Sequence, residues 1–174
     1  MNIDFSFNCS RNVLDECKNL YERTFDSSKF GNFNLNSLIA HENEKLIGFI
    51  DASPVFNYPN EFFILIHKSF DLNKPIPNLN ENQYLGGLGE DLYVSRMAIS
   101  EELRNNYLGS ELLDRSLPKI KNHYGIDSKR TWVFTTPENP SEQFWLKNNF
   151  KFFIRYNFLE KWNPKFQNVF YKSI

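Results

Sequence analysis

The sequence contains few cysteines, no long hydrophobic run and no excess of charge of one sign. Its 174 residues include only Cys9 and Cys17, which form neither a Cys-x-x-Cys motif nor a Cys/His spacing. A disulfide framework and a zinc site are therefore disfavoured. We expect both cysteines to be reduced thiols, buried as small apolar side chains.

The longest apolar runs fall well short of the roughly 20 residues that a membrane-spanning helix requires. The first residues, MNIDFSFNCSRN, also lack the basic start and the apolar middle of a secretory signal peptide. We therefore expect a cytoplasmic protein that does not associate with a membrane.

Positive charge is balanced by negative charge, with 20 Lys and Arg residues against 21 Asp and Glu residues. Without a basic field or a long basic block, a nucleic-acid partner is disfavoured. The aromatic content of 17% is typical of stacking platforms for bases as well as of an apolar core. In the absence of a basic groove, the core is the better interpretation.

The length and a hydrophobic content of 41% predict a single domain over residues 1–174. In its first half, residues 2–7 alternate as an edge strand does, and Ser10 is a candidate N-cap for a following helix. Residues 36–53 hold two apolar segments around the polar turn ENEK, which predicts a hairpin with a loop of about four residues.

Two segments of the first half leave alternatives open. EFFILIHKSF, at residues 61–70, fits a further strand or a buried helical segment, because its length does not decide between them. Residues 71–90 are rich in Asn, Pro and Gly and are long for a structureless connection. They form either a functional lid or a disordered surface segment.

The second half alternates strands with helices. We expect strands at residues 91–99, 130–136, 150–158 and 168–174, with one helix after a turn at 100–109 and another at 139–149. Together with the front hairpin, this order predicts an α/β (α+β) fold. Its mixed, mostly antiparallel central sheet is flanked by helices.

The stretch RNNYLGSELL, at residues 104–113, places a polar turn between a strand and a helix. Such a turn leaves the first backbone N–H groups of the helix unpaired, at the end where the helix dipole favours negative charge. Gly109 would allow close approach of an anion, Arg104 would donate charged hydrogen bonds, and Ser110 would add a hydroxyl. A pyrophosphate site is one interpretation, although strand-turn-helix segments with one glycine are common.

Two motifs resemble those of the GNAT superfamily of N-acetyltransferases. VSRMAISEELRNNYLGSELL follows that family's strand, short acidic turn and Arg/Gln-x-x-Gly-x-Gly/Ala helix start, with Arg104 opening the motif and Gly109 closing it. FWLKNNF, at residues 144–150, is similar to the family's Phe-Tyr-x-Lys-x-Gly-Phe helix. Together the motifs cover residues from about 92 to 158.

The resemblance implies a GNAT-like acyl-CoA acyltransferase fold with acetyl-CoA as co-substrate and no metal. The strand backbone would hold the acetyl and pantetheine groups at a bulged or splayed strand, the turn would wrap the pyrophosphate, and the later helix would flank the pantetheine arm. The cofactor-binding residues it implies are Met97, Ala98, Ile99, Arg104, Asn105, Asn106, Tyr107, Leu108, Gly109, Ser110, Asn139, Phe144 and Trp145.

Three positions depart from the family's pattern. Tyr107 stands at the first motif glycine, where a side chain costs energy if φ is positive. Trp145 stands where the family often has a tyrosine thought to protonate the departing thiolate, and an indole N–H is hardly an acid. We expect it to pack against the cofactor arm. Asn149 replaces the final glycine, and asparagine is the next-best residue for a left-handed helix cap.

Acetyl transfer to an amine requires a polarised carbonyl and a proton acceptor. A backbone N–H near Met97 is a candidate for the first role. Strand alternation puts four residues on one face, namely Asp91, Tyr93, Ser95 and Met97. Asp91 is our hypothetical base, against the alternative of a solvated carboxylate at the start of a strand. Tyr156 is a reserve acid, against the alternative of strand packing with an exposed hydroxyl.

Two functions from different classes follow from the sequence. The first is an N-acetyltransferase that acts on a primary amine of a small molecule, a peptide or a protein. The second is a catalytically lapsed member of the fold that binds coenzyme A as a sensor or interaction module. Turnover distinguishes them. The acceptor and the oligomeric state do not follow from composition, and a homodimer is one arrangement the sequence allows.

Overall fold

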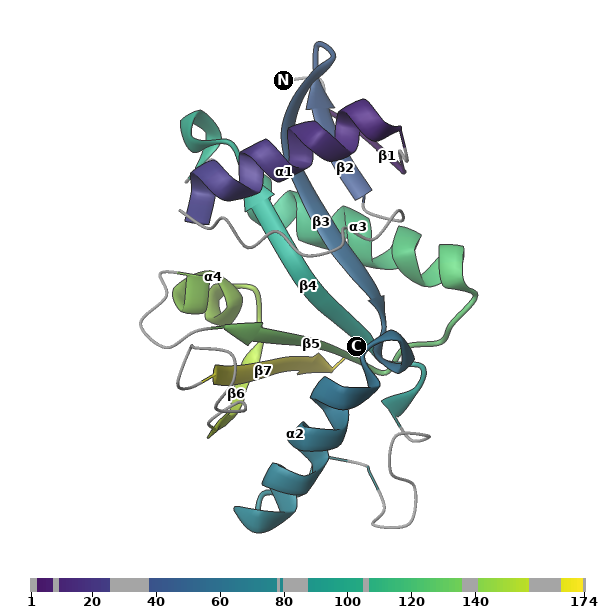
Figure 1. The fold of residues 1–174 in the computed structure, drawn as a ribbon, viewed down its shortest axis with the longest axis vertical. Helices are drawn as coiled ribbons and strands as arrows, with labels where there is room; N and C mark the ends of the chain where they lie inside the picture. Colours follow the sequence, from purple (N-terminus) through teal and green to yellow (C-terminus); the bar gives the residue numbers. More distant parts are fainter. Residues whose placement is uncertain are drawn as a thin grey trace. The chain divides into compact units, whose positions relative to one another are not determined.

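The computed structural model describes residues 3–7, 10–25, 38–77, 79, 88–104, 107–135, 141–156 and 167–173. These contain seven strands (Figure 1): β1 (Ile3–Phe7), β2 (Leu38–Glu42), β3 (Lys45–Pro54), β4 (Leu92–Ile99), β5 (Arg130–Thr135), β6 (Lys151–Tyr156) and β7 (Gln167–Ser173). The same part of the chain has four α-helices, α1 (Arg11–Phe25), α2 (Pro59–Asp71), α3 (Leu108–Tyr124) and α4 (Ser141–Lys147). Its short 3-10 turns include η1 (Val55–Asn57) and η3 (Glu101–Leu103).

The strands follow the order β1-β2-β3-β4-β5-β7-β6 in one sheet. The pairs β1–β2, β2–β3, β5–β7 and β6–β7 are antiparallel. The predicted α/β (α+β) architecture, a mixed and mostly antiparallel sheet with flanking helices, is confirmed. The edge position predicted for the first strand is also confirmed.

The chain divides into two compact units, and each is interrupted in sequence by the other. Unit 1 comprises residues 1–53 and 94–125, and unit 2 comprises residues 54–93 and 126–174. The single domain over residues 1–174 stays a prediction.

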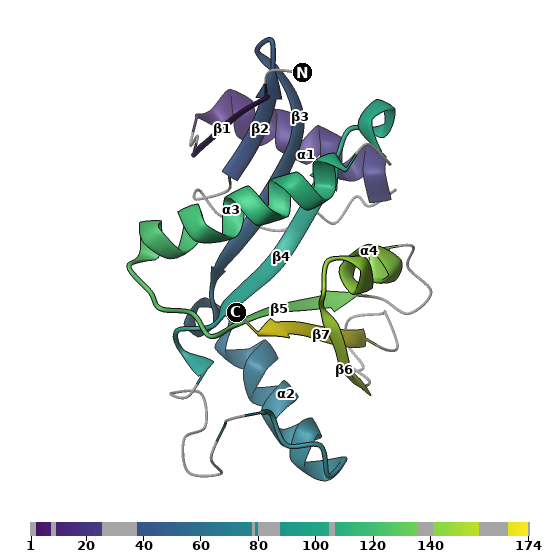
Figure 2. The same cartoon turned by 180° about the vertical axis from the view of Figure 1, so that it is seen from behind.

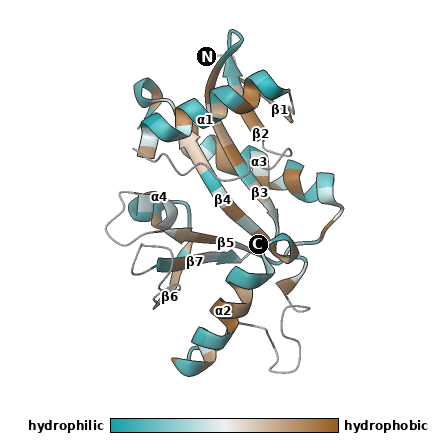
Figure 3. Cartoon of the chain, in the orientation of Figure 1, coloured by the Kyte–Doolittle hydropathy of each residue, from teal (hydrophilic) through white to brown (hydrophobic). Residues whose placement is uncertain are grey.

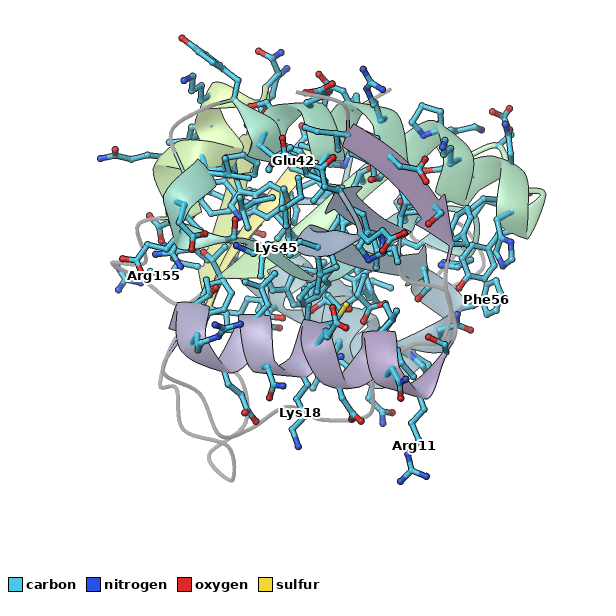
Figure 4. The ribbon with its side chains drawn as sticks, turned by 90° about the horizontal axis from the view of Figure 1, so that it is seen from above. Arg11, Lys18, Glu42, Lys45, Phe56 and Arg155 are labelled. Carbon is cyan, nitrogen blue, oxygen red and sulfur yellow. The ribbon has the colours of Figure 1, made fainter. Side chains whose placement is uncertain are left out.

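In unit 1, helix α1 covers one face of the strand layer and helix α3 covers the opposite face (Figures 1 and 2). The predicted N-cap is confirmed, because Ser10 Oγ accepts a hydrogen bond from the Val13 N–H at 3.4 Å. One stripe of α1 packs against the sheet in an apolar core that includes Cys17, Leu20, Ile39, Leu46, Phe49 and Ala98. Figure 4 shows Arg11 and Lys18 pointing away from that core.

The hairpin between β2 and β3 turns through two residues instead of the expected four. Asn43 and Glu44 have φ angles of 48° and 66°, the left-handed values that a two-residue type I′ turn requires. The turn is short because Glu42 and Lys45 already pair across the two strands.

In unit 2, residues 61–70, for which the sequence left a strand or a helical segment open, are helical. Pro59 lies at the first turn of α2, where a missing N–H costs nothing. The helix buries Phe62, Leu65 and Ile66 in a core with Trp132, Phe153, Ile154 and Val169. Figure 3 shows the corresponding hydrophobic band along α2.

The described ends of the connection at residues 71–90 are attached to the same core. Ile76 and Leu88 are both buried in it. Residues 78 and 80–87 lie outside the described residues. The choice between a lid and a disordered surface segment therefore stays open.

Candidate cofactor-binding and active site

The end of strand β4 carries the residues expected to hold the acetyl group. Ala98 is buried and packs in the core of unit 1 with Ile39 and Phe49. Its neighbours Met97 and Ile99 are half-buried. The strand continues into η3, whose exposed Glu101 and Glu102 form the acidic turn of the motif.

Helix α3 begins immediately after the left-handed residue Tyr107, whose φ is 59° and ψ is −2°. The φ of Tyr107 is therefore positive, the case in which we expect an energetic cost, because this conformation favours glycine. The Tyr107 side chain is 72% exposed, so its ring extends into solvent. Asn105 and Asn106 lie outside the described residues.

The first turn of α3 offers a set of backbone donors. The Glu111 N–H donates to the Tyr107 carbonyl oxygen at 3.0 Å. The N–H groups of the three preceding helical residues therefore have no acceptor in the preceding turn of the helix. These residues are Leu108, Gly109 and Ser110.

This first turn fits the pyrophosphate of a coenzyme A. Leu108 is buried and anchors the turn, whereas Gly109 and Ser110 are half-buried. Arg104, which precedes these residues in the sequence, is exposed. Three N–H groups, the positive end of the helix dipole and a guanidinium are the groups that bind phosphates.

Helix α4 presents the second expected motif. Trp145 is 5% exposed and makes edge-to-face contacts with Phe144 and Phe150, at centroid distances of 4.9 Å and 5.1 Å. Its packing against a cofactor arm stays a prediction. Asn139 lies outside the described residues.

The helix cap predicted for Asn149 is confirmed. Its φ is 65°, and its N–H donates to the Leu146 carbonyl while the Phe150 N–H donates to the Trp145 carbonyl. These two bonds define a Schellman motif, in which asparagine takes the place of the usual glycine.

Asp91, the hypothetical base, is held in a buried ion pair. Its Oδ2 accepts hydrogen bonds from Arg130 Nε at 2.7 Å and from Trp132 Nε1 at 2.8 Å. Arg130 Nη1 also donates to the Pro77 carbonyl. The alternative of a solvated carboxylate is wrong, since Asp91 is 2% exposed.

Burial raises the pKa of Asp91, and the Trp132 hydrogen bond and the Arg130 charge oppose this shift. A base role for Asp91 stays a prediction.

Tyr156 is buried in the core of unit 2 and its hydroxyl is not solvent-accessible, so the alternative of an exposed hydroxyl is also wrong. Burial, with a smaller effect of Glu61, raises the Tyr156 pKa. Its role as an acid stays a prediction.

Sequence reasoning missed a polar cluster in unit 1, formed by Asp51 on β3 and by Ser95 and Arg96 on β4. Asp51 Oδ2 accepts a hydrogen bond from Ser95 Oγ at 2.8 Å and faces Arg96 Nη1 at 3.3 Å. The available signal was a single carboxylate within the apolar segment LIGFIDAS. Its partners are 44 and 45 positions away, and no spacing rule identifies them.

Helix α1 faces this cluster. Burial, assisted by Glu16 and Asp51, raises the pKa of the Cys17 thiol to about 12. Cys17 is a free, buried cysteine as predicted, whereas Cys9 lies outside the described residues. Burial also raises the pKa of Tyr21, and the Arg96 charge opposes that shift.

Two classes of feature are missing from the part of the chain that the structure describes. No group of three or more His, Cys, Asp or Glu side chains there could hold a metal ion. No helix there is both long and apolar enough to cross a membrane.

Comparisons with solved structures find the same fold at low sequence identity. An IAA acetyltransferase from Bacillus cereus has a TM-score of 0.63 and 12% identity, with 99% of this chain and 100% of that chain covered. Naa50 from Arabidopsis thaliana, in complex with the bisubstrate analogue CoA-Ac-MVNAL, has a TM-score of 0.60 and 14% identity, with both chains fully covered. A GNAT family acetyltransferase from Elizabethkingia anophelis, with acetyl-CoA bound, has a TM-score of 0.63 and 15% identity, with 99% of each chain covered.

No curated protein matches the chain significantly. The family model of the acetyltransferase (GNAT) family, in contrast, matches residues 7–150. This match spans most of the sequence and includes both motifs. The chain belongs to the acetyltransferase (GNAT) family.

Proposed function

We propose that the protein is an acetyl-CoA-dependent N-acetyltransferase whose acceptor is a primary amine of a small molecule, a peptide or a protein. The observation that carries this proposal is the first turn of α3. Its N–H groups at Leu108, Gly109 and Ser110 come after the strand that would hold the acetyl group, with residues 100–107 between them. The family match over residues 7–150 supports it.

In this proposal, most contacts to the cofactor are made by backbone. The strand segment 97–99 holds the acetyl and pantetheine groups, residues 104–110 wrap the pyrophosphate, and Asn139, Phe144 and Trp145 flank the pantetheine arm. Bound acetyl-CoA supplies the thioester that is transferred. Because Trp145 is no acid, the departing thiolate takes its proton from another group, for which Tyr156 is our candidate.

The ligand of one structural neighbour supports the proposed acceptor class. The analogue bound to the Arabidopsis Naa50 joins coenzyme A to an acetylated peptide sequence, which supports a peptide N-terminus among the acceptors. We also propose a cytoplasmic location, with neither nucleic acid nor membrane as a partner. A homodimer remains one arrangement to test by sedimentation.

Thermal unfolding with and without acetyl-CoA tests the proposal. A ligand at about 100 times its dissociation constant adds about 2.7 kcal/mol to the folded state. We expect a clear rise in Tm when acetyl-CoA binds. We also expect release of the free thiol of coenzyme A when primary amines are added. Unchanged Tm at millimolar acetyl-CoA, in a folded protein free of carried-over ligand, would contradict the proposal.

One observation favours a second function. A tryptophan, buried between two phenylalanines, stands at the position of the family's acidic tyrosine. A coenzyme A sensor without catalysis would show the rise in Tm but no thiol release with any amine.

A further inference from the structure

The buried polar cluster of unit 1 has no evident structural purpose. The side chain of Asp51 is 1% exposed and that of Arg96 is 17% exposed, while Phe49 and Ala98, two positions along the same strands, belong to the apolar core. A buried ion pair seldom stabilises a fold more than apolar side chains of similar volume would. The cluster is therefore a candidate for a functional role.

Ser95 is the member of the cluster that is arranged to exchange protons. Its hydroxyl directs its single proton at Asp51, with Oγ lying 2.8 Å from Oδ2 and 3.2 Å from the backbone oxygen. A serine hydroxyl also has two lone pairs. They can accept a hydrogen bond from a proton donor while the hydroxyl proton remains directed at the carboxylate. A hydroxyl paired with a base in this way is the arrangement found in activated nucleophiles.

Asp51 can reach a substrate only through another group. Asp51 is buried, and the side chains that contact its Oδ2 include Ser95 and Arg96. Arginine does not give up its proton in proteins. Of these two contacts, Ser95 is the one that can exchange a proton with Asp51, and it is half-buried.

The position of Ser95 along β4 places it near the expected reaction. It precedes Met97 by two residues, which corresponds to about 7 Å of strand. Adjacent strand residues normally point to opposite faces. The convergence of Ser95 and Arg96 on one oxygen therefore requires a local break in this alternation or an Arg96 side chain that reaches across. A bulged or splayed strand is expected at this part of β4.

We propose that Ser95 is a catalytic residue that relays the proton of the acceptor amine to Asp51, an inference that rests on the proposed N-acetyltransferase function. The nitrogen of the neutral amine attacks the thioester carbonyl carbon and the N–C bond forms. The nitrogen's proton passes to Ser95 Oγ as the hydroxyl proton of Ser95 passes to Asp51 Oδ2. The C–S bond then breaks, coenzyme A leaves as the thiolate, and the proton on Asp51 returns through Ser95 to that thiolate, a route that takes the place of Tyr156 as the acid.

The groups around the cluster are compatible with this role. Arg96 places a positive charge beside the carboxylate and offsets the cost of burying it. On α1, the charge of Asp51 acts on Cys17 and the charge of Arg96 acts on Tyr21, while Glu16 acts on Cys17. Because burial raises the pKa values of the Cys17 thiol and the Tyr21 hydroxyl, both stay protonated at neutral pH and do not compete as bases.

The test compares Ser95→Ala, Ser95→Thr and Asp51→Asn with the unchanged protein. The assay follows thiol release from acetyl-CoA, with benzylamine and a free tetra-alanine peptide as acceptors. We expect Ser95→Ala to lower kcat by about 10²- to 10⁴-fold, the usual contribution of a general base, and to leave the acetyl-CoA-induced rise in Tm unchanged. Ser95→Thr keeps the hydroxyl and should stay within about tenfold of the parent rate. Ser6→Ala on β1 is the matched control and should keep the full rate.

Each outcome decides between the two proposals or removes both. A Ser95→Ala protein with the parent kcat and pH profile would overturn the relay alone, and so would equal losses in the alanine and threonine variants. A parent protein that binds acetyl-CoA but releases no thiol with either amine would overturn the transferase function and the relay with it. If Asp51→Asn does not fold, the Ser95 pair decides, because Ser95→Ala removes only one hydroxyl.

Discussion

Arg130 and Asp91 form a buried ion pair in which Nε and Oδ2 are 2.7 Å apart, and Trp132 donates to the same oxygen. Loss of Arg130 removes the positive charge that is paired with the buried Asp91 carboxylate. We expect Arg130→Met to lower the free energy of unfolding by about 3–5 kcal/mol, measured by urea denaturation.

The double variant Asp91→Asn/Arg130→Met is the control for this first prediction. Because it removes both charges, it should recover most of the stability lost in Arg130→Met. Equal destabilisation in the single and double variants would mean that the ion pair is not what the single variant disturbs.

The left-handed conformation of Tyr107 gives a second prediction. Its φ of 59° is one that glycine adopts without steric cost. Tyr107→Gly should therefore raise the free energy of unfolding by about 1 kcal/mol, measured by chemical denaturation. Gly125, at the other end of α3, has a φ of 63° and is the opposite control, since Gly125→Ala should cost about 1 kcal/mol.

A third prediction concerns Gly48 on strand β3. A Cβ at this position would lie 2.7 Å from Ile99 Cδ1 and 3.2 Å from the Ala98 carbonyl oxygen. The side chain of Ile99 can move, but the backbone oxygen is fixed by the strand. We expect Gly48→Ala to destabilise the protein by about 1–3 kcal/mol, and a Tm equal to that of the parent would contradict the contact.

The Cys17 thiol provides a pH-dependent prediction. Its pKa is raised to about 12 from an ordinary value of 9.0, so the folded protein keeps a proton that the unfolded chain loses above pH 9. The free energy of unfolding should therefore fall between pH 9 and pH 12, relative to a Cys17→Ala variant.

Because the thiolate is the reactive form, iodoacetamide at pH 8.5 should modify Cys17 in urea but not in the folded protein, as read by peptide mass spectrometry.

The elements that carry the cofactor motif were predictable because their signals are local. The strand before Arg104, the turn and the helix that follows it all produce local sequence patterns, and the Asn149 cap follows from one residue type. The helical form of residues 61–70 was not predictable, because a buried apolar run has no clear period and its packing partners lie on distant strands.

The burial of Asp91 and the Asp51 cluster also lay beyond the sequence. Arg130 is separated from Asp91 by 39 positions and Ser95 from Asp51 by 44. Such pairings depend on strand topology, which no local pattern specifies. Alternation along one strand identified Ser95 as a neighbour of Met97, but the partner on β3 was visible only in the structure.

The interleaving of the two units affects how the chain is synthesised and divided. Unit 1 needs residues 94–125 to complete its core and unit 2 needs residues 126–174, so neither core is whole when the first 93 residues have left the ribosome. The ends of residues 54–93 must also come together before unit 1 closes, at an entropic cost. No single cut of the chain separates one unit from the other, and a shortened protein that retains only one of them cannot be made by trimming a terminus.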